Sequence, residues 1–267
     1  MKEQQLLPFI SNENLFKQVK HVLDIAKAAS SKAEGRLFTN AIDPFSALFD
    51  ALLQGISLKQ WLEQEKARQT QKTLQNALGG FHQEVLGSIP GWISLGTGNV
   101  FDLKNDSLKI IAEVKNKYNT TKGNHKVAIY DDLNGQLGVG YKGYKAYYVE
   151  IIPKKRMVYD KPFTPSDNRT HQRRDAREDI RVIDGKSFYE LATGDSEAIK
   201  KLYNVLPAVI NNLLSKDGNK TNHSYQQGDD SSFSADIIRD ASRGYVGKKS
   251  RNTEENRGYT ELFEKVY

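Results

Sequence analysis

Two acidic segments joined by a short turn-rich linker constrain this chain more than any other feature of its sequence. Residues 98–102 end on an aspartate, Asp102, and an apolar run further along leads into Glu113-Val114-Lys115. Both segments are typical of short β-strands. Because side chains alternate along a strand, Glu113 and Lys115 share one face, whereas Val114 points the other way into a core. If the two strands pair, Asp102 lies beside Glu113.

Two carboxylates and a lysine at one sheet edge have the chemistry needed to hydrolyse a phosphodiester. The oxygens of Asp102 and Glu113 suit a divalent cation, and the Lys115 ammonium would lie beside a metal-bound water. The alternative is structural: Asp102 and Lys104 bracket a turn, and Glu113 and Lys115 form an ion pair. Spacing alone leaves both interpretations open.

The string of an acid, any residue and a lysine is weakly specific, because it occurs three times in this chain. At Asp102-Leu103-Lys104 no acid ends a preceding strand, and Asp184-Gly185-Lys186 contains a dipeptide typical of a hairpin turn. Glu113-Val114-Lys115 follows an apolar run and a predicted strand that ends in an acid. This context favours Glu113-Val114-Lys115 as the candidate site.

Composition excludes several classes of protein and favours a nucleic-acid partner. The chain has 267 residues, a mean hydropathy of −0.64 and no cysteine, so a disulfide framework and a thiolate zinc site are excluded. It has no apolar run near the roughly 20 residues that cross a bilayer and no signal-peptide pattern, which predicts a cytoplasmic protein without membrane contact. Residues 103–126 and 151–186 each carry a surplus of four positive charges, whereas the chain as a whole has a net charge of +6. Such basic stretches are typical of nucleic-acid binding, although an ordinary solvated surface is the alternative.

Apolar spacing and capping residues predict a helical first part of the chain. The expected helices are residues 12–32, a second that starts at Asp43-Pro44, and a third after Ser57 that runs to residue 86 with a break at Gly79-Gly80. Together the helices up to residue 64 predict an N-terminal helical region.

An alternation of strands and helices follows and predicts an α/β core over residues 65–215. Beyond the two acidic strands, the pattern predicts a helix at 127–137, a strand at 145–152, a hairpin at 180–189 and a helix from about 195 to 206. Residues 154–179 form a basic loop within this core. Residues 216–267 are expected to be a mobile loop and a C-terminal helical segment.

Four longer strings resemble type II restriction endonucleases, in particular the group that cuts the degenerate palindrome GGNCC. They are residues 43–49, 65–76, 95–103 and 110–120. The resemblance spans most of residues 40–210 and implies the PD-(D/E)XK nuclease fold, a central mixed sheet flanked by helices. It further implies Mg²⁺ dependence and cleavage of duplex DNA by a homodimer. One departure is that Phe101, not proline, precedes Asp102.

In this interpretation the motif residues take defined roles. Asp102, Glu113 and Lys115 are catalytic, and Asp102 and Glu113 hold Mg²⁺ together with the Val114 carbonyl. Glu84, on the helix before the first strand, is a further candidate for the metal shell, with a plain surface glutamate as the alternative.

DNA contacts are expected on two basic segments. The residues just after the motif are expected to lie along the DNA backbone: Lys117, Tyr118, Asn119 and Lys122. Guanine is read in the major groove by arginine or lysine. The candidates for this reading lie on the basic loop: Arg169, Arg173, Arg174 and Arg177, with Lys154, Lys155 and Arg156 as the second choice.

Two other functions remain open from the residues alone. One is a nuclease of the same fold that acts in repair as a monomer. The other is a non-catalytic nucleic-acid-binding protein whose acids are structural. As a restriction enzyme, the protein would share its DNA site with a cognate methyltransferase that need not bind it.

Overall fold

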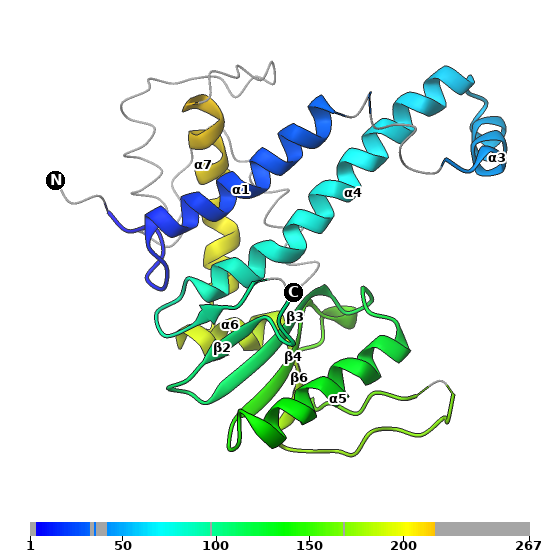
Figure 1. Ribbon diagram of the computed structural model, residues 1–267. Helices are drawn as coiled ribbons and strands as arrows, with labels where there is room; N and C mark the ends of the chain where they lie inside the picture. Colours follow the sequence, from blue (N-terminus) through cyan, green and yellow to red (C-terminus); the bar gives the residue numbers. More distant parts are fainter. Residues whose placement is uncertain (1–3, 33–34, 36–41, 97, 168, 217–267) are drawn as a thin grey trace. The chain divides into compact units, whose positions relative to one another are not determined.

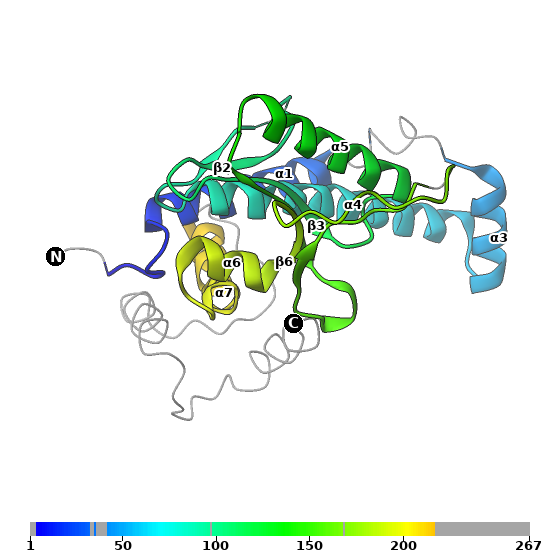
Figure 2. The ribbon, with the colours of Figure 1, turned by 90° about the horizontal axis from the view of Figure 1, so that it is seen from below.

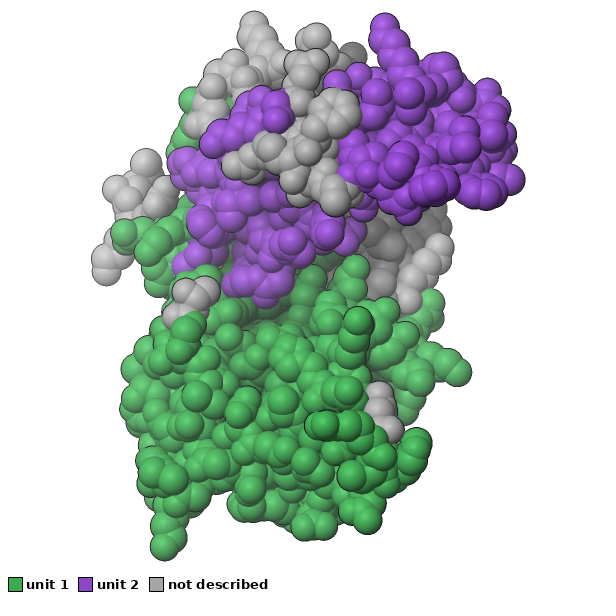
Figure 3. Space-filling view, turned by 45° about the vertical axis from the view of Figure 1, so that its right-hand side comes forward, with its two compact units in different colours: residues 1–17, 82–267 green, residues 18–81 purple. Residues whose placement is uncertain are grey.

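The protein divides into two compact units, each with its own architecture. The computed structural model describes residues 4–32, 35, 42–96, 98–167 and 169–216. Residues 18–81 form one unit, and residues 1–17 with 82–267 form the other (Figure 3). The predicted loop and helical segment beyond residue 216 lie outside the described residues.

A mixed six-stranded sheet organises the larger unit. Its order is β1-β2-β3-β4-β6-β5. The strands are β1 (Ile93–Ser94), β2 (Leu103–Asn105), β3 (Ile110–Lys117), β4 (Lys145–Ile152), β5 (Asp160–Pro162) and β6 (Ile180–Asp184). β3, β4 and β6 run parallel. β2 pairs antiparallel with β3, β1 pairs antiparallel with β2, and β5 pairs antiparallel with β6. The predicted α/β class with a central mixed sheet is confirmed.

Helices cover both faces of this sheet (Figures 1 and 2). Helix α5 (Gly123–Val139) presents an apolar stripe at Val127, Tyr130, Leu133 and Leu137, spaced three to four residues apart as one face of a helix requires. It packs into a buried cluster with the β3, β4 and β6 side chains. On the other face lies α6 (Gly185–Thr193), followed by α7 (Ala198–Lys216), which continues past Pro207.

Two predicted elements of this unit are wrong. Residues 98–102 are bends, not a strand, and β2 begins only at Leu103, so the turn shifts to residues 106–109. The predicted hairpin at 180–189 is a strand followed directly by α6. Asp184 caps this helix, because its carboxylate accepts hydrogen bonds from the Ser187 backbone N–H (3.1 Å) and hydroxyl (2.7 Å). The Asp-Gly pair therefore starts a helix here and makes no turn between strands.

The smaller unit is helical, and its helices start at the predicted residues. Asp43 caps α3 (Pro44–Gln54) by accepting a hydrogen bond from the Phe45 backbone N–H at 2.9 Å. Ser57 and Gln60 form a capping box ahead of α4 (Leu58–Gly87). The paired glycines at 79 and 80 do not divide α4. Helix α1 (Asn12–Ser31) and α4 contribute residues to both units.

No helix within the described ranges is both long and apolar enough to span a membrane.

The junction between β6 and α6 tolerates no side chain larger than a hydrogen atom. A Cβ on Gly185 would lie 2.3 Å from the Ile151 carbonyl oxygen of β4, whereas a Cβ on Gly135 of α5 would meet nothing within 4 Å. We expect Gly185→Ala to lower the free energy of unfolding by about 1–3 kcal/mol, the usual cost of overpacking. Gly135→Ala should leave it unchanged or raise it by up to about 1 kcal/mol. Urea denaturation of both variants tests this, and equal stabilities would contradict the close approach.

Candidate active site

The pairing of β2 with β3 brings the two predicted carboxylates together. Leu103 pairs with Ala112 in antiparallel register, so the next pair outward is Asp102 opposite Glu113. The Asp102 backbone N–H donates to the Ala112 carbonyl at 3.0 Å. The Val114 backbone N–H donates in turn to the Asp102 carboxylate at 2.8 Å. The position of the Asp102 carboxylate is therefore fixed by main-chain bonds to the strand that carries Glu113.

Phe101 anchors the bend from which Asp102 projects. Its side chain is 3% exposed and packs edge-to-face on Tyr141, with ring centroids 5.1 Å apart. The buried Phe101 ring thus holds this part of the backbone in place, at the position where the PD-(D/E)XK motif has proline.

Lys115 lies against Glu113 on the same face of β3, as the alternation predicted. The Lys115 ammonium donates to a Glu113 carboxylate oxygen at 2.5 Å. Glu113 keeps 14% of its side chain exposed and Lys115 keeps 27%. The site is therefore shielded, yet it remains accessible to solvent and ligands on the lysine side.

The surroundings of Glu113 disfavour its ionised form. Burial of the Glu113 carboxyl, and next the negative charge of Asp102, raise its pKa from the ordinary 4.5 to about 7. The Lys115 ammonium lowers this pKa but does not cancel the two larger effects. Carboxyl groups that repel each other in a partly buried site are the donor set that a hard divalent cation stabilises. Two oxygen-bearing side chains with a backbone carbonyl nearby therefore fit Mg²⁺.

Glu84 lies at the end of α4, where its carboxylate accepts a hydrogen bond from the Ser94 hydroxyl at 2.8 Å. Within the described part of the chain, no group of three or more acidic, histidine or cysteine side chains is arranged to hold a metal. A direct role for Glu84 beside Asp102 and Glu113 stays a prediction.

A further carboxylate, that of Glu150, lies next to the site and was missed by sequence reasoning. Glu150 of β4 is the register partner of Lys115 and is 6% exposed. It accepts hydrogen bonds from the Lys126 ammonium and the Tyr159 hydroxyl, both at 2.5 Å. Burial, and the hydrogen bond to Glu150, raise the pKa of Tyr159. The one available signal was a lone acid inside the apolar strand pattern of residues 145–152.

The residues just after the motif lead from β3 toward the start of α5. Lys117 is the last residue of β3, and the Tyr118 backbone N–H donates to the Ile152 carbonyl at 3.0 Å, which extends the parallel pairing. Asn119 and Lys122 are exposed, and Lys122 precedes the first turn of α5. Lysines at the end of the strand and at a helix N-terminus form a surface suited to phosphate.

The arginines of the basic loop separate into two pairs. Arg174 makes a two-bond ion pair with Asp131 of α5, at 2.8 Å for each bond. Arg177 pairs with Asp179 and also donates to Asn134 of α5. These two side chains fasten the loop to α5, beside which it runs in Figure 1.

The other pair is more open to a ligand. Arg173 and Arg169 are exposed. The Arg173 guanidinium contacts the Thr164 carbonyl at 3.2 Å. Of the four predicted readers, these two have the greater freedom to reach a base.

Comparison with known proteins agrees with this geometry. A family model described as Eco47II restriction endonuclease matches residues 7–215. The type II restriction enzyme Eco47II of Escherichia coli is 44% identical over 215 residues, which cover 79% of this chain and 89% of that enzyme. The type II restriction enzyme Sau96I of Staphylococcus aureus is 30% identical over 212 residues, which cover 78% of this chain and 81% of that enzyme. No solved structure gives a significant match.

The family model spans most of the chain, and the match includes β3 with its acid–lysine motif, the arginine loop and α5. The resemblance expected from the sequence is thereby confirmed. This chain belongs to the Eco47II restriction endonuclease family and is a type II site-specific deoxyribonuclease.

Proposed function

We propose that Asp102, Glu113 and Lys115 form the active site through which this restriction enzyme hydrolyses both strands of duplex DNA at a short palindrome, GGNCC. The observation that carries the proposal is the carboxyl pair across β2 and β3, where burial and then the charge of Asp102 raise the pKa of Glu113 to about 7 beside a lysine. A purely structural ion pair between Glu113 and Lys115 would not require Asp102 beside it.

Asp102 and Glu113 would hold Mg²⁺, with the Val114 carbonyl as a third protein ligand. When bound, the ion supplies positive charge that polarises the scissile phosphate and lowers the pKa of a water molecule. The Val114 N–H keeps the Asp102 carboxylate in place during this chemistry. The Lys115 ammonium would orient the attacking water and offset the negative charge that develops on the phosphate.

The recognition of GGNCC would divide between the two basic segments. Lys117, Tyr118, Asn119 and Lys122 would contact the backbone, which gives affinity without sequence information. Arginine of the loop would read guanine O6 and N7. A homodimer suits this site, because a two-fold protein presents one active site to each strand of a palindrome. In the cytoplasm, a cognate methyltransferase would protect the same sequence in the host DNA.

Digestion of a mapped plasmid with Mg²⁺ or with EDTA, followed by sequencing of the ends, tests the function. Discrete bands that need Mg²⁺, with ends at GGNCC, support the proposal. A smear or nicked circles would indicate a repair-type nuclease, and intact DNA that shifts on a gel would indicate a binding protein.

The proposed metal site predicts the effect of removing one of its carboxylates. Asp102→Asn should abolish cleavage while keeping DNA binding, because the lost charge belongs to the metal site and not to the DNA-facing lysines. Asp106→Asn is the matched control, since this exposed aspartate of the following turn pairs with Lys104 and Tyr144. The control should cleave at the wild-type rate. Normal cleavage by Asp102→Asn at ordinary Mg²⁺ would remove Asp102 from the active site.

The raised pKa of Glu113 predicts how stability changes with pH in EDTA. The folded protein holds the Glu113 proton up to about pH 7, whereas the unfolded chain releases it near 4.5. Between these values the folded state binds more protons, so this carboxyl lowers stability as pH rises through the window. Glu113→Gln cannot ionise and should be more stable than the wild type by about 1–3 kcal/mol at pH 8, with no gain at pH 4.5.

Glu65 supplies a control of opposite sign. The hydrogen bond from Arg68 lowers the pKa of Glu65, so its charge stabilises the folded state above pH 4.5. Glu65→Gln should therefore be less stable than the wild type at pH 8. Urea denaturation across pH 4.5–8 measures all three proteins, and a Glu113→Gln gain that does not grow with pH would contradict the buried carboxyl pair.

The exposed loop arginines and the lysines that follow the motif should respond differently to substitution. Arg173→Ala should lose mainly cognate binding and cleavage, because each arginine–guanine contact discriminates by about 1–3 kcal/mol. Lys122→Ala should weaken binding to every sequence and flatten the log–log salt slope by about 0.9. Binding to cognate and scrambled duplexes across a salt series separates the two effects.

Asp131→Asn is the control for the loop itself. It removes the partner of Arg174 while leaving all four arginines in place. If this variant and Arg173→Ala lose the same factor on both duplexes, the loop clamps phosphate and the base-reading residues lie elsewhere, first at Lys154, Lys155 and Arg156.

A further inference from the structure

Helix α3 of the smaller unit has two apolar faces, and its own unit buries one of them. Ala47 and Ala51 are buried against Trp61 of α4. This contact explains why the helix packs where it does. It accounts for none of the large side chains of α3.

The opposite face exposes large apolar side chains in the spacing of a helix interface. Exposure runs from 57% for Leu48 to 85% for Leu53. The exposed set is Phe45, Leu48, Phe49, Leu52 and Leu53 of α3, with Leu58 at the start of α4. The first four recur at positions i, i+3, i+4 and i+7, which places them along one stripe. A stripe of this kind is the pattern by which one helix packs on another.

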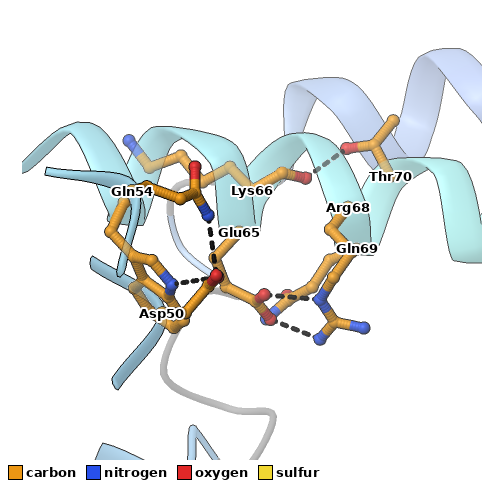
Figure 4. Close-up of polar contacts among 8 residues, drawn as sticks. Asp50, Gln54, Glu65, Lys66, Arg68, Gln69 and Thr70 are labelled. Atoms are coloured by element: carbon orange, nitrogen blue, oxygen red, sulfur yellow. Dashed lines mark hydrogen bonds and ion pairs between the residues drawn. The ribbon is translucent and has the colours of Figure 1, made fainter. Parts of the chain in front are cut away.

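The polar groups around this stripe are satisfied within the unit. Asp50 is the one charged residue in the sequence of α3, and its carboxylate accepts hydrogen bonds from Trp61 Nε1 at 3.0 Å and Gln54 Nε2 at 2.7 Å. Further along α4, Glu65 accepts two bonds from Arg68 (Figure 4). The outward face of α3 carries no cation that could bind phosphate, so nucleic acid does not fit it.

The area of the patch matches one half of a stable interface. At roughly 150–250 Å² for a large apolar side chain, six side chains exposed by more than half present on the order of 600–1,000 Å². Isolated monomers rarely show an apolar patch above about 600 Å². A standard protein interface buries about 800 Å² on each partner.

We propose that the exposed face of α3, with Leu58, is the surface through which two copies of this chain associate. An uncharged apolar stripe is complementary to itself, as a two-fold contact requires, and two such patches together reach the area of a stable dimer. This proposal rests on the proposed function in one respect, which is that cleavage of a palindrome calls for a dimer. It adds the surface through which the dimer forms.

Sedimentation velocity of the full chain without DNA tests this interface. The wild type should sediment as a dimer at micromolar concentration. Phe49→Glu and Leu52→Glu should each weaken self-association by at least 100-fold and sediment as monomers. Val139→Glu is the matched control, because Val139 at the end of α5 is 92% exposed and lies outside the stripe. The control should remain a dimer, and circular dichroism melts should show that all variants are folded.

A second measurement keeps the test independent of stability. The chain has no cysteine, so a single introduced thiol has only its copy to pair with. Under mild oxidation, Leu52→Cys should give a disulfide-linked dimer, whereas Val139→Cys should remain monomeric on a denaturing gel. The reverse pattern, a monomeric wild type, or glutamate variants that stay dimeric would each overturn the proposal. So would flotation of the wild-type chain with phosphatidylcholine–phosphatidylglycerol vesicles in place of dimer formation, because the patch would then bind lipid.

Failure of this interface and failure of the proposed function give different results. Asp102→Asn should remain a dimer without cleaving, which isolates the chemistry from the association. If Phe49→Glu is a dimer that cleaves normally, the interface is wrong and the nuclease assignment stands. If the wild type is a dimer through α3 but leaves DNA intact in Mg²⁺, the interface stands and the nuclease site is wrong.

Discussion

The register between β2 and β3 is the constraint on which the proposed active site depends. A slip by one residue would turn the side chains of one strand to the opposite face, and Asp102 would no longer meet Glu113. Two features hold the register in place. Ile111 and Ala112 are fully buried, so their removal from the core would be costly, and the Val114 N–H binds the Asp102 carboxylate directly. The packing energy of the sheet therefore fixes the geometry of the acids.

Glu150 of β4 and Glu113 of β3 show how the surroundings of a carboxylate decide its effect on the fold. Glu150 is deeply buried, and its charge is matched by Lys126 and its second oxygen by the Tyr159 hydroxyl. Glu113 has Lys115 but also faces Asp102, so repulsion and burial together raise its pKa. A satisfied carboxylate holds α5 and the β5 side of the sheet near β4. Glu113, whose ion pair with Lys115 does not offset its burial and the charge of Asp102, lowers the stability of the metal-free fold and would offer oxygen ligands to a cation.

The sequence predicts the parts of this structure that local patterns determine. The caps at Asp43 and Ser57 mark helix starts correctly, and alternation along β3 places Glu113 beside Lys115. The same local reasoning fails at Asp184-Gly185, because an aspartate before glycine suits a hairpin turn and a helix N-cap equally well. Local patterns do not predict ion pairs between residues that are distant in sequence. Arg174 meets Asp131 across 43 residues, a pairing that follows from the packing of the loop on α5 and not from the composition of either segment.

The distribution of charge separates the two kinds of association that we propose for this enzyme. The segments expected to contact DNA are rich in lysine and arginine, and their affinity for phosphate falls as salt rises. The outward face of α3 has no charge, and apolar association is maintained or strengthened by salt. A dimer held through α3 would thus persist under conditions that release DNA. Because α3 presents no cation to phosphate and the basic segments present few large apolar side chains, neither surface competes for the other's partner. An enzyme built in this way can leave a non-cognate sequence by losing phosphate contacts while keeping its two active sites together.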